Sequence, residues 1–119
     1  HPLETVAYFK NFCENNCLKY SILTNSDDFE VRAGVAYFSV SDRMLGQFLS
    51  QCRMRKLEPG IDTGIISYNE TPMKQFIYKG ITVLSTDFEM LGKKAADFVV
   101  NDLPMNFCVP TSMIVRESL

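Results

Sequence analysis

The stretch GITVLSTDFEMLG, residues 80–92, changes from a strand-like pattern to a helix-like pattern within a few positions. Its aliphatic and β-branched residues at 81–84 favour a strand. Phe88 then begins a series of apolar residues at helical spacing, which ends at Leu103-Pro104 because proline cannot continue a helix. The polar residues 85–87 lie at the changeover. This stretch therefore predicts a strand that leads directly into a helix, with polar side chains at the carboxyl end of the strand.

Strand-like and helix-like segments alternate outward from this stretch. The run VAYFSV at 35–40 is continuously apolar, as in the central strand of a sheet that is covered on both faces. Short connections between alternating elements predict an α/β fold, a doubly wound parallel sheet with helices on both faces. Such a unit begins with a strand, whereas this sequence begins with a helix, so we expect it to be the tail of a longer protein. The predicted elements are helices at residues 3–16, 42–57, 71–78 and from 88 to the proline at 104, and strands at residues 18–24, 35–40, 63–68 and 81–84, followed by an extended stretch at 108–115.

The composition is that of one modest domain. Of the 119 residues 46% are hydrophobic, enough for a packed core, and 12 basic residues against 14 acidic ones give a net charge of −2. This charge does not favour binding of a nucleic-acid backbone by this part of the protein. Four cysteines and a single histidine, His1, show no metal-site pattern, so we expect reduced thiols, no metal and no cofactor. No apolar run approaches the roughly 20 residues of a membrane helix and no signal peptide opens the chain, so we expect a cytoplasmic protein without a membrane partner.

Polar residues follow three of the predicted strands. They are Ser41-Asp42, Asn69-Glu70 and the segment 85–87. In an open parallel sheet, ligands bind beyond the carboxyl ends of the strands, so these residues would line one crevice, with Phe88 as an apolar face beside them. Some of them also fit local roles. Thr86-x-x-Glu89 matches a helix capping box, and Asp42 is a favoured residue type at a helix start.

Two stretches and the ending resemble a known family. Residues 81–92 followed by Lys-Lys-Ala-Ala, together with DTGIISYNET at 62–71, look like the sensor-domain tail of lactose- and galactose-repressor-type (LacI/GalR) transcription regulators. The ending VPTSMIVRESL at 109–119 is similar to the closing proline-to-Arg-x-Ser segment of that family. The resemblance runs from about residue 6 onward and is strongest from 62, whereas between 28 and 41 this chain is shorter than the family pattern.

The resemblance implies a class I periplasmic-binding-protein-like sensor of two subdomains with a small effector between them. Residues 1–87 would supply most of the second subdomain without its first strand, and residues 88–119 would cross back towards the first. The first subdomain and the DNA-reading domain would lie outside this sequence. The function implied is that of the effector-sensing part of a ligand-responsive transcriptional regulator, with DNA as a partner only through the missing domain.

The resemblance also implies which residues face the effector. Asn69 stands where the family often has Asp, and the absence of the family's usual Arg near Thr5 makes a neutral sugar or sugar derivative the expected ligand rather than a charged one. Paired donors and acceptors bind polyols, and an aromatic face covers the apolar side of a sugar ring. Two members have competing roles, which the residue types favour: a place in the core for Phe29 and a helix cap for Asp42. The expected effector-binding residues are Asn69, Ser41, Thr86, Phe88, Phe29 and Asp42.

A homodimer is the expected assembly. In the family, two helices of the second subdomain form a symmetric subunit interface. The predicted helices 42–57 and 71–78 both carry broad apolar faces. The shorter helix has more apolar surface than a single contact with the core requires. The alternative is that both faces only cover the sheet. The expected interface residues are Met44, Met73, Phe76 and Ile77.

Other classes of protein fit less well. A sugar-binding component of a transporter shares the expected fold and remains an alternative, which a signal peptide upstream would favour. An enzyme is disfavoured because the single histidine, His1, lies at the terminus and because no Gly-x-Ser-x-Gly motif or phosphate-binding glycine loop is present. A phosphorelay receiver is disfavoured by the strand order and by the ending of the chain.

Overall fold

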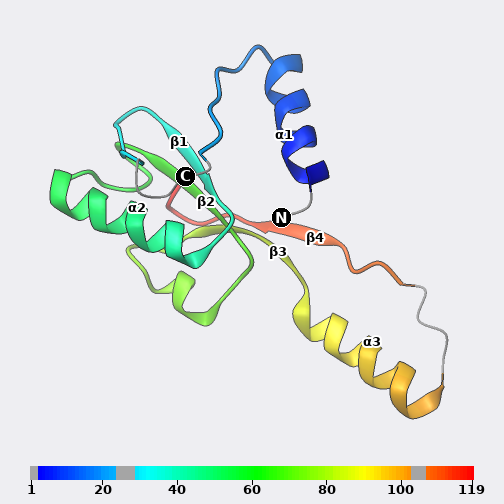
Figure 1. The fold of residues 1–119 in the computed structure, drawn as a ribbon. Helices are drawn as coiled ribbons and strands as arrows, with labels where there is room; N and C mark the ends of the chain where they lie inside the picture. The colour runs from blue at the N-terminus through cyan, green and yellow to red at the C-terminus, as the bar shows by residue number, and fades with distance from the viewer. Residues whose placement is uncertain (1–2, 24–28, 103–106) are drawn as a thin grey trace. The chain divides into compact units, whose positions relative to one another are not determined.

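The computed structural model describes residues 3–23, 29–102 and 107–119 (Figure 1). It divides into two compact units, His1–Glu30 and Val31–Leu119. No helix among the described residues is long and apolar enough to cross a membrane.

The first unit contains the helix α1 (Leu3–Asn15), which confirms the helix predicted at 3–16. The strand predicted at 18–24 is wrong over residues 18–23, which have no regular secondary structure, and Thr24 lies outside the described residues. A strand needs a neighbour to complete its hydrogen bonds, and no described residue of this unit supplies one. Instead the Tyr20 hydroxyl donates to Glu14 Oε1 at 2.9 Å, and the Tyr20 ring meets the Phe9 ring edge-on at 5.8 Å between centroids.

The second unit is built on a four-stranded sheet whose spatial order is β1-β2-β3-β4. The first three strands run parallel, with Tyr37 opposite Ile65 and Ser67 opposite Val83. The last strand pairs antiparallel with β3. This mostly parallel sheet with intervening helices confirms the predicted α/β fold. The strands are β1 (Ala36–Ser39), β2 (Gly64–Tyr68), β3 (Thr82–Thr86) and β4 (Thr111–Ile114).

The predicted central position of the first of these strands is wrong. β1 is an edge strand of the described sheet, because it pairs with β2 and no second described segment lies along its other side. Its flanking residues Val35 and Val40, and Phe38 within it, are accordingly exposed. An apolar pattern indicates a strand, but it does not show whether another strand of the described chain pairs with each of its two edges.

The helix α2 (Asp42–Arg55) follows β1 and packs against the sheet. Ser41 is its N-cap and accepts a hydrogen bond from Met44 N at 3.2 Å. Its buried face includes Phe48, whose ring centroid lies 5.3 Å from that of Tyr37 in β1. The core of this unit consists of Val31, Leu45, Phe48, Cys52, Ile65, Ile81 and Val83.

The first of the two later helices is shorter than predicted, and the second differs from the prediction only in its N-cap. The helix predicted at 71–78 is a single 3-10 turn, η2 (Pro72–Gln75), and its N-cap Thr71 makes no side-chain capping bond. The helix α3 (Phe88–Asn101) forms as predicted, and the predicted proline stop at 103–104 lies outside the described residues. The capping box at Thr86 is wrong, because Asp87 is the N-cap and accepts from Met90 N at 2.9 Å. Thr86 is still the last residue of β3.

The C-terminal residues lie between the amino-terminal ends of β2 and β3. The Ser118 hydroxyl accepts from Thr82 N at 2.8 Å and donates to Ile65 O at 2.7 Å, while Ile65 N donates to Ser118 O at 2.8 Å. The tail also passes so close to Gly60 that a Cβ there would lie 1.8 Å from Glu117 O. This tail therefore covers the amino-terminal edge of the sheet, whereas loops lie at the carboxyl edge.

Candidate functional site

The carboxyl ends of the parallel strands β1, β2 and β3 lie along one edge of the sheet. Ser41-Asp42 follows β1, Asn69-Glu70 follows β2, and Thr86-Asp87 ends β3. Backbone bonds hold neighbouring ends together, since Asn69 N donates to Leu84 O at 2.8 Å. The structure therefore places the three predicted polar groups at the same edge.

A buried lysine that the sequence did not indicate joins two of these groups. Lys74, in η2, is 2% exposed, and its Nζ donates to Tyr68 O at 3.0 Å and to Asn69 O at 2.7 Å. The same atom lies 2.8 Å from Asp42 Oδ1, in an ion pair whose acidic partner is 68% exposed. Lysine is normally exposed, and nothing in the local sequence marks this one as buried. Only the folded chain brings its acceptors together.

Asn69 has an unusual backbone conformation. Its φ is +62°, a left-handed value that asparagine tolerates better than most residues. Its backbone N–H and carbonyl are both bonded, to Leu84 O and Lys74 Nζ respectively. Its side-chain amide, by contrast, makes no hydrogen bond with any residue that the structure describes, although the residue is only partly exposed. This amide is therefore available to a ligand at the strand end.

Ser41 and Asp42 have separate roles. The Ser41 hydroxyl caps α2, and its carbonyl accepts a bond from Ser39 Oγ at 2.8 Å. The capping alternative for Asp42 is therefore wrong, because its carboxylate pairs with Lys74 instead. Within the described part of the chain, Asp42 Oδ2 makes no hydrogen bond. Asp42 thus keeps one oxygen for a ligand.

The other polar residues of this edge are engaged within the protein. Glu70 N donates to Ser85 Oγ at 2.9 Å, and the Glu70 carboxylate pairs with Arg116. Arg116 Nη1 also donates to Ile81 O at 2.7 Å. The Thr86 hydroxyl shares a long hydrogen bond of 3.4 Å with that of Thr111 in β4. Glu70 and Ser85 therefore fix the edge, while Thr86 retains hydrogen-bonding capacity.

The two aromatic candidates lie in different surroundings. Phe88 opens α3 directly beyond β3 and is 51% exposed. Phe29 belongs to the first unit and is 7% exposed, as its alternative role in a core requires. Phe88 thus offers an accessible ring and Phe29 does not.

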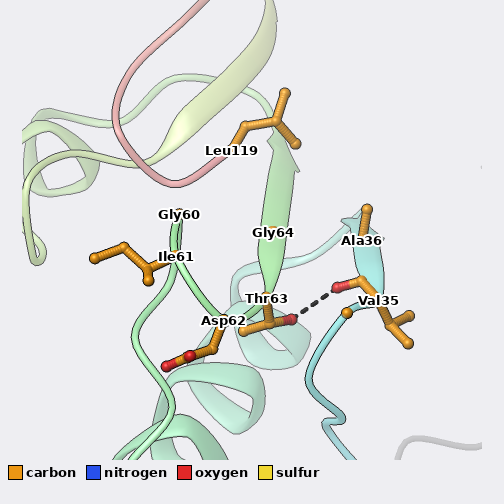
Figure 2. A pocket seen from close by; sticks show the side chains of 9 residues that line it. Val35, Ala36, Gly60, Ile61, Asp62, Thr63, Gly64 and Leu119 are labelled. Atoms are coloured by element: carbon orange, nitrogen blue, oxygen red, sulfur yellow. Dashed lines mark hydrogen bonds between the residues drawn. The ribbon is translucent and has the colours of Figure 1, made fainter.

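A shallow hollow of about 300 Å³ lies at the opposite edge, by the amino-terminal ends of β1 and β2. Figure 2 shows Thr63 and Val35 in its wall, joined by a bond of 2.8 Å from Thr63 Oγ1 to Val35 O. The nearby Asp62 carboxylate already accepts from Glu58 N at 2.7 Å. The hollow therefore has few polar groups to orient a ligand, and the strand-end group is the better candidate.

Potential metal ligands and thiols are the other groups with binding or catalytic potential in the described part of the chain. They contain no group of three or more histidine, cysteine, aspartate or glutamate side chains that could hold a metal ion. Cys52 is buried, and burial, followed by the negative charge of Asp62, raises the pKa of its thiol. A raised pKa disfavours the thiolate, which is the reactive form.

Comparisons with solved structures identify proteins of similar fold. The chain matches a LacI-family transcription regulator from Corynebacterium glutamicum at 24% identity, with a TM-score of 0.55, over 70% of this chain and 34% of the other. It matches the Lac repressor dimer bound to operator and an anti-inducer at 21% identity, with a TM-score of 0.58, over 72% and 32%. A periplasmic binding protein/LacI transcriptional regulator from Alkaliphilus metalliredigens, complexed with D-xylulofuranose, matches at 11% identity with a TM-score of 0.66, over 92% and 48%.

These likenesses show that the chain shares the periplasmic-binding-protein-like α/β fold of LacI-type transcription regulators, as predicted. The chain spans about a third of the length of the first solved structures it matches. No family model matches the sequence, and no curated protein matches it either.

Proposed function

We propose that this chain is the effector-sensing part of a ligand-responsive transcriptional regulator and that it binds a neutral sugar or sugar derivative. The observation that carries the proposal is that two residues at the carboxyl edge of the sheet, Asn69 and Asp42, are held by Lys74 while the Asn69 amide makes no hydrogen bond with any described residue. An amide supplies both donors and an acceptor, and a carboxylate oxygen accepts, which is what a polyol needs. The shared fold with LacI-type regulators supports the regulatory role.

The remaining site residues complete this proposal. The exposed ring of Phe88 would cover the apolar side of a sugar, and the hydroxyls of Thr86 and Ser41 would lie beside it. The solved structure with bound D-xylulofuranose supports a sugar as the class of ligand. Phe29 is the weakest member of the proposed site because it is buried.

The site would be completed by a second subdomain outside these residues. Residues 1–87 would form most of one subdomain and residues 88–119 would cross back to the other. Every residue of α3 is exposed, including apolar ones such as Phe98 and Val99, so this helix lacks the cover that an amphipathic helix requires. In Figure 1, α3 extends away from the carboxyl end of β3. DNA would be bound by a domain that these residues do not contain.

The assembly would be a homodimer. Met73 and Phe76, in and just after η2, are strongly exposed, and Met44 and Ile77 are partly exposed. A two-fold interface would let this apolar surface meet its own copy. The Lac repressor of similar fold is a dimer on its operator, which supports this arrangement.

Titration calorimetry of the complete protein with neutral monosaccharides, D-xylulose among them, tests the proposal. Binding of one sugar, together with a sugar-dependent change in operator binding, is the expected result. Sugar binding without any effect on DNA would instead support a transporter component, and turnover of the sugar would support an enzyme. An absence of binding across the panel would overturn the sugar proposal.

A further inference from the structure

We propose that Lys74 is a positioning residue of the strand-end site, which holds Asn69 and Asp42 in their ligand-facing arrangement without touching the ligand itself. This inference rests on the proposed function. Its starting observation is a lysine that is 2% exposed and whose ammonium contacts both of the residues that keep unpaired polar atoms at this edge.

The Lys74 ammonium is not accessible to a ligand. An ammonium has three N–H donors, and three acceptors surround this one: Tyr68 O, Asn69 O and Asp42 Oδ1, at 3.0, 2.7 and 2.8 Å. Burial also keeps a ligand away from the Nζ atom. Its effect on binding must therefore pass through the groups that it holds.

The ammonium anchors the backbone of Asn69. A left-handed backbone is unfavourable for a residue with a Cβ, and at Asn69 the bond from the carbonyl to Lys74 offsets that cost. The bond from Asn69 N to Leu84 O fixes the other side of the residue. With both backbone groups anchored, the Cα–Cβ bond of Asn69 points in one defined direction.

The same ammonium joins two different strand ends. Asp42 lies in the first turn of α2, after β1, whereas Asn69 follows β2. One charged group thus joins the backbone of Asn69 to the carboxylate of Asp42. A cluster of ligand-binding groups must be held to within a fraction of an ångström, and buried polar contacts are a means to that end.

Stability alone does not account for this lysine. Taking an ammonium out of water is costly, and replacing a buried ion pair by apolar side chains of similar volume is often neutral or stabilising. Buried polar contacts can instead fix one arrangement of the groups that they join, and we infer this role for Lys74. The contacts of Lys74 select the arrangement of Asp42 and Asn69.

The test uses the complete protein, D-xylulose and the other neutral monosaccharides as probes, and the variants Lys74→Met and Lys74→Arg. Lys79→Met is the matched control, because Lys79 is exposed and lies 3.5 Å from Glu58 in a surface ion pair. We expect Lys74→Met to remain folded by circular dichroism and to bind the probe about tenfold or more weakly, with Lys74→Arg restoring part of the affinity and Lys79→Met unchanged. A folded Lys74→Met that binds like the wild type would overturn the proposal.

Nuclear magnetic resonance decides the case in which Lys74→Met does not fold. In the wild type, the Lys74 ammonium signals should shift together with those of the Asn69 amide when the probe is added. A probe that shifts other residues of the site but neither of these would contradict the inference. If no monosaccharide binds the wild type, the proposed function fails. The backbone chemical shifts of Asn69 in a folded Lys74→Met then test the positioning role of Lys74 separately. Loss of the left-handed conformation of Asn69 supports that role, and unchanged shifts exclude it.

Discussion

Lys74 and Asp42 form an ion pair of 2.8 Å although the lysine is buried and the aspartate is mostly exposed. The pair connects η2, which follows β2, with α2, which follows β1. Removing one partner of a buried pair leaves an uncompensated charge, whereas an exposed partner retains water. Loss of the Asp42 carboxylate should therefore leave the buried Lys74 ammonium without its opposite charge.

Asn69→Gly should lower the affinity for the sugar by about 1–3 kcal/mol, because it leaves groups of the bound ligand unpaired. Glycine adopts positive φ readily, so the backbone of this variant should keep the wild-type conformation. Calorimetry on the complete protein measures the effect. Asn101→Ala, at the end of the exposed α3, is the control, and an unchanged affinity of Asn69→Gly would remove Asn69 from the site.

Phe88→Ala should also weaken sugar binding, because the exposed ring is placed to cover one face of the ligand. The variant should be less stable in the complete protein as well, if α3 packs there against the other subdomain. Calorimetry and thermal unfolding separate the two effects. A purely thermal defect with intact binding would assign Phe88 to a core.

Gly60→Ala and Gly46→Ala should have opposite effects on the free energy of unfolding. A Cβ at Gly60 would meet Glu117 O at 1.8 Å, at a φ of +86°, so alanine should destabilise by more than about 1 kcal/mol and displace the C-terminal tail. Gly46 lies inside α2 with open space around it, so alanine should stabilise by about 1 kcal/mol. Urea unfolding of both variants measures these changes. Equal effects would mean that the tail does not pack on Gly60 in solution.

Iodoacetamide should modify Cys17 and Cys108 before Cys13 and Cys52, because the first two are exposed and the others are buried. Burial raises the pKa of the Cys52 thiol, so its folded form holds the proton more tightly than its unfolded form. The stability from this thiol is therefore present below its unfolded pKa and is lost as the pH rises through the raised folded value. Mass spectrometry at several pH values follows the labelling. Early labelling of Cys52 would mean that α2 does not pack as described.

The local pattern of the sequence was sufficient to predict most of the fold. The apolar runs that became β1, β2 and β3 and the helical spacing that became α2 and α3 are short-range signals, and the strand-end positions of Ser41, Asn69 and Thr86 follow from them. The strand predicted at 18–24 failed because pairing depends on a neighbour that spacing does not reveal. The capping box failed because Thr86 and Asp87 both fit a helix start, and only the length of β3 decides between them.

Lys74 could not be found in this way. Its burial depends on the carboxylate of Asp42, 32 positions earlier in the chain, and on two carbonyls at the end of β2. No local pattern distinguishes it from the exposed Lys79. The site is defined by interactions between different elements, and such interactions can be identified only in the folded structure.

A charge at Phe76 tests the proposed dimer. Phe76 follows η2 and is 75% exposed, with Met73 of the same segment also exposed, so the surface is apolar without being covered by any described residue. Burying an unpaired carboxylate in an apolar interface is costly, so Phe76→Glu should convert a dimer into a folded monomer. Sedimentation equilibrium of the complete protein measures the mass, and circular dichroism checks the fold. Tyr8→Glu is the control, because Tyr8 is equally exposed but lies on α1, and it should leave the mass unchanged. If Phe76→Glu unfolds, Phe76 is a core residue of the complete protein. If it stays a folded dimer, the subunits meet at another surface, because an interface centred on Phe76 would not tolerate the new charge.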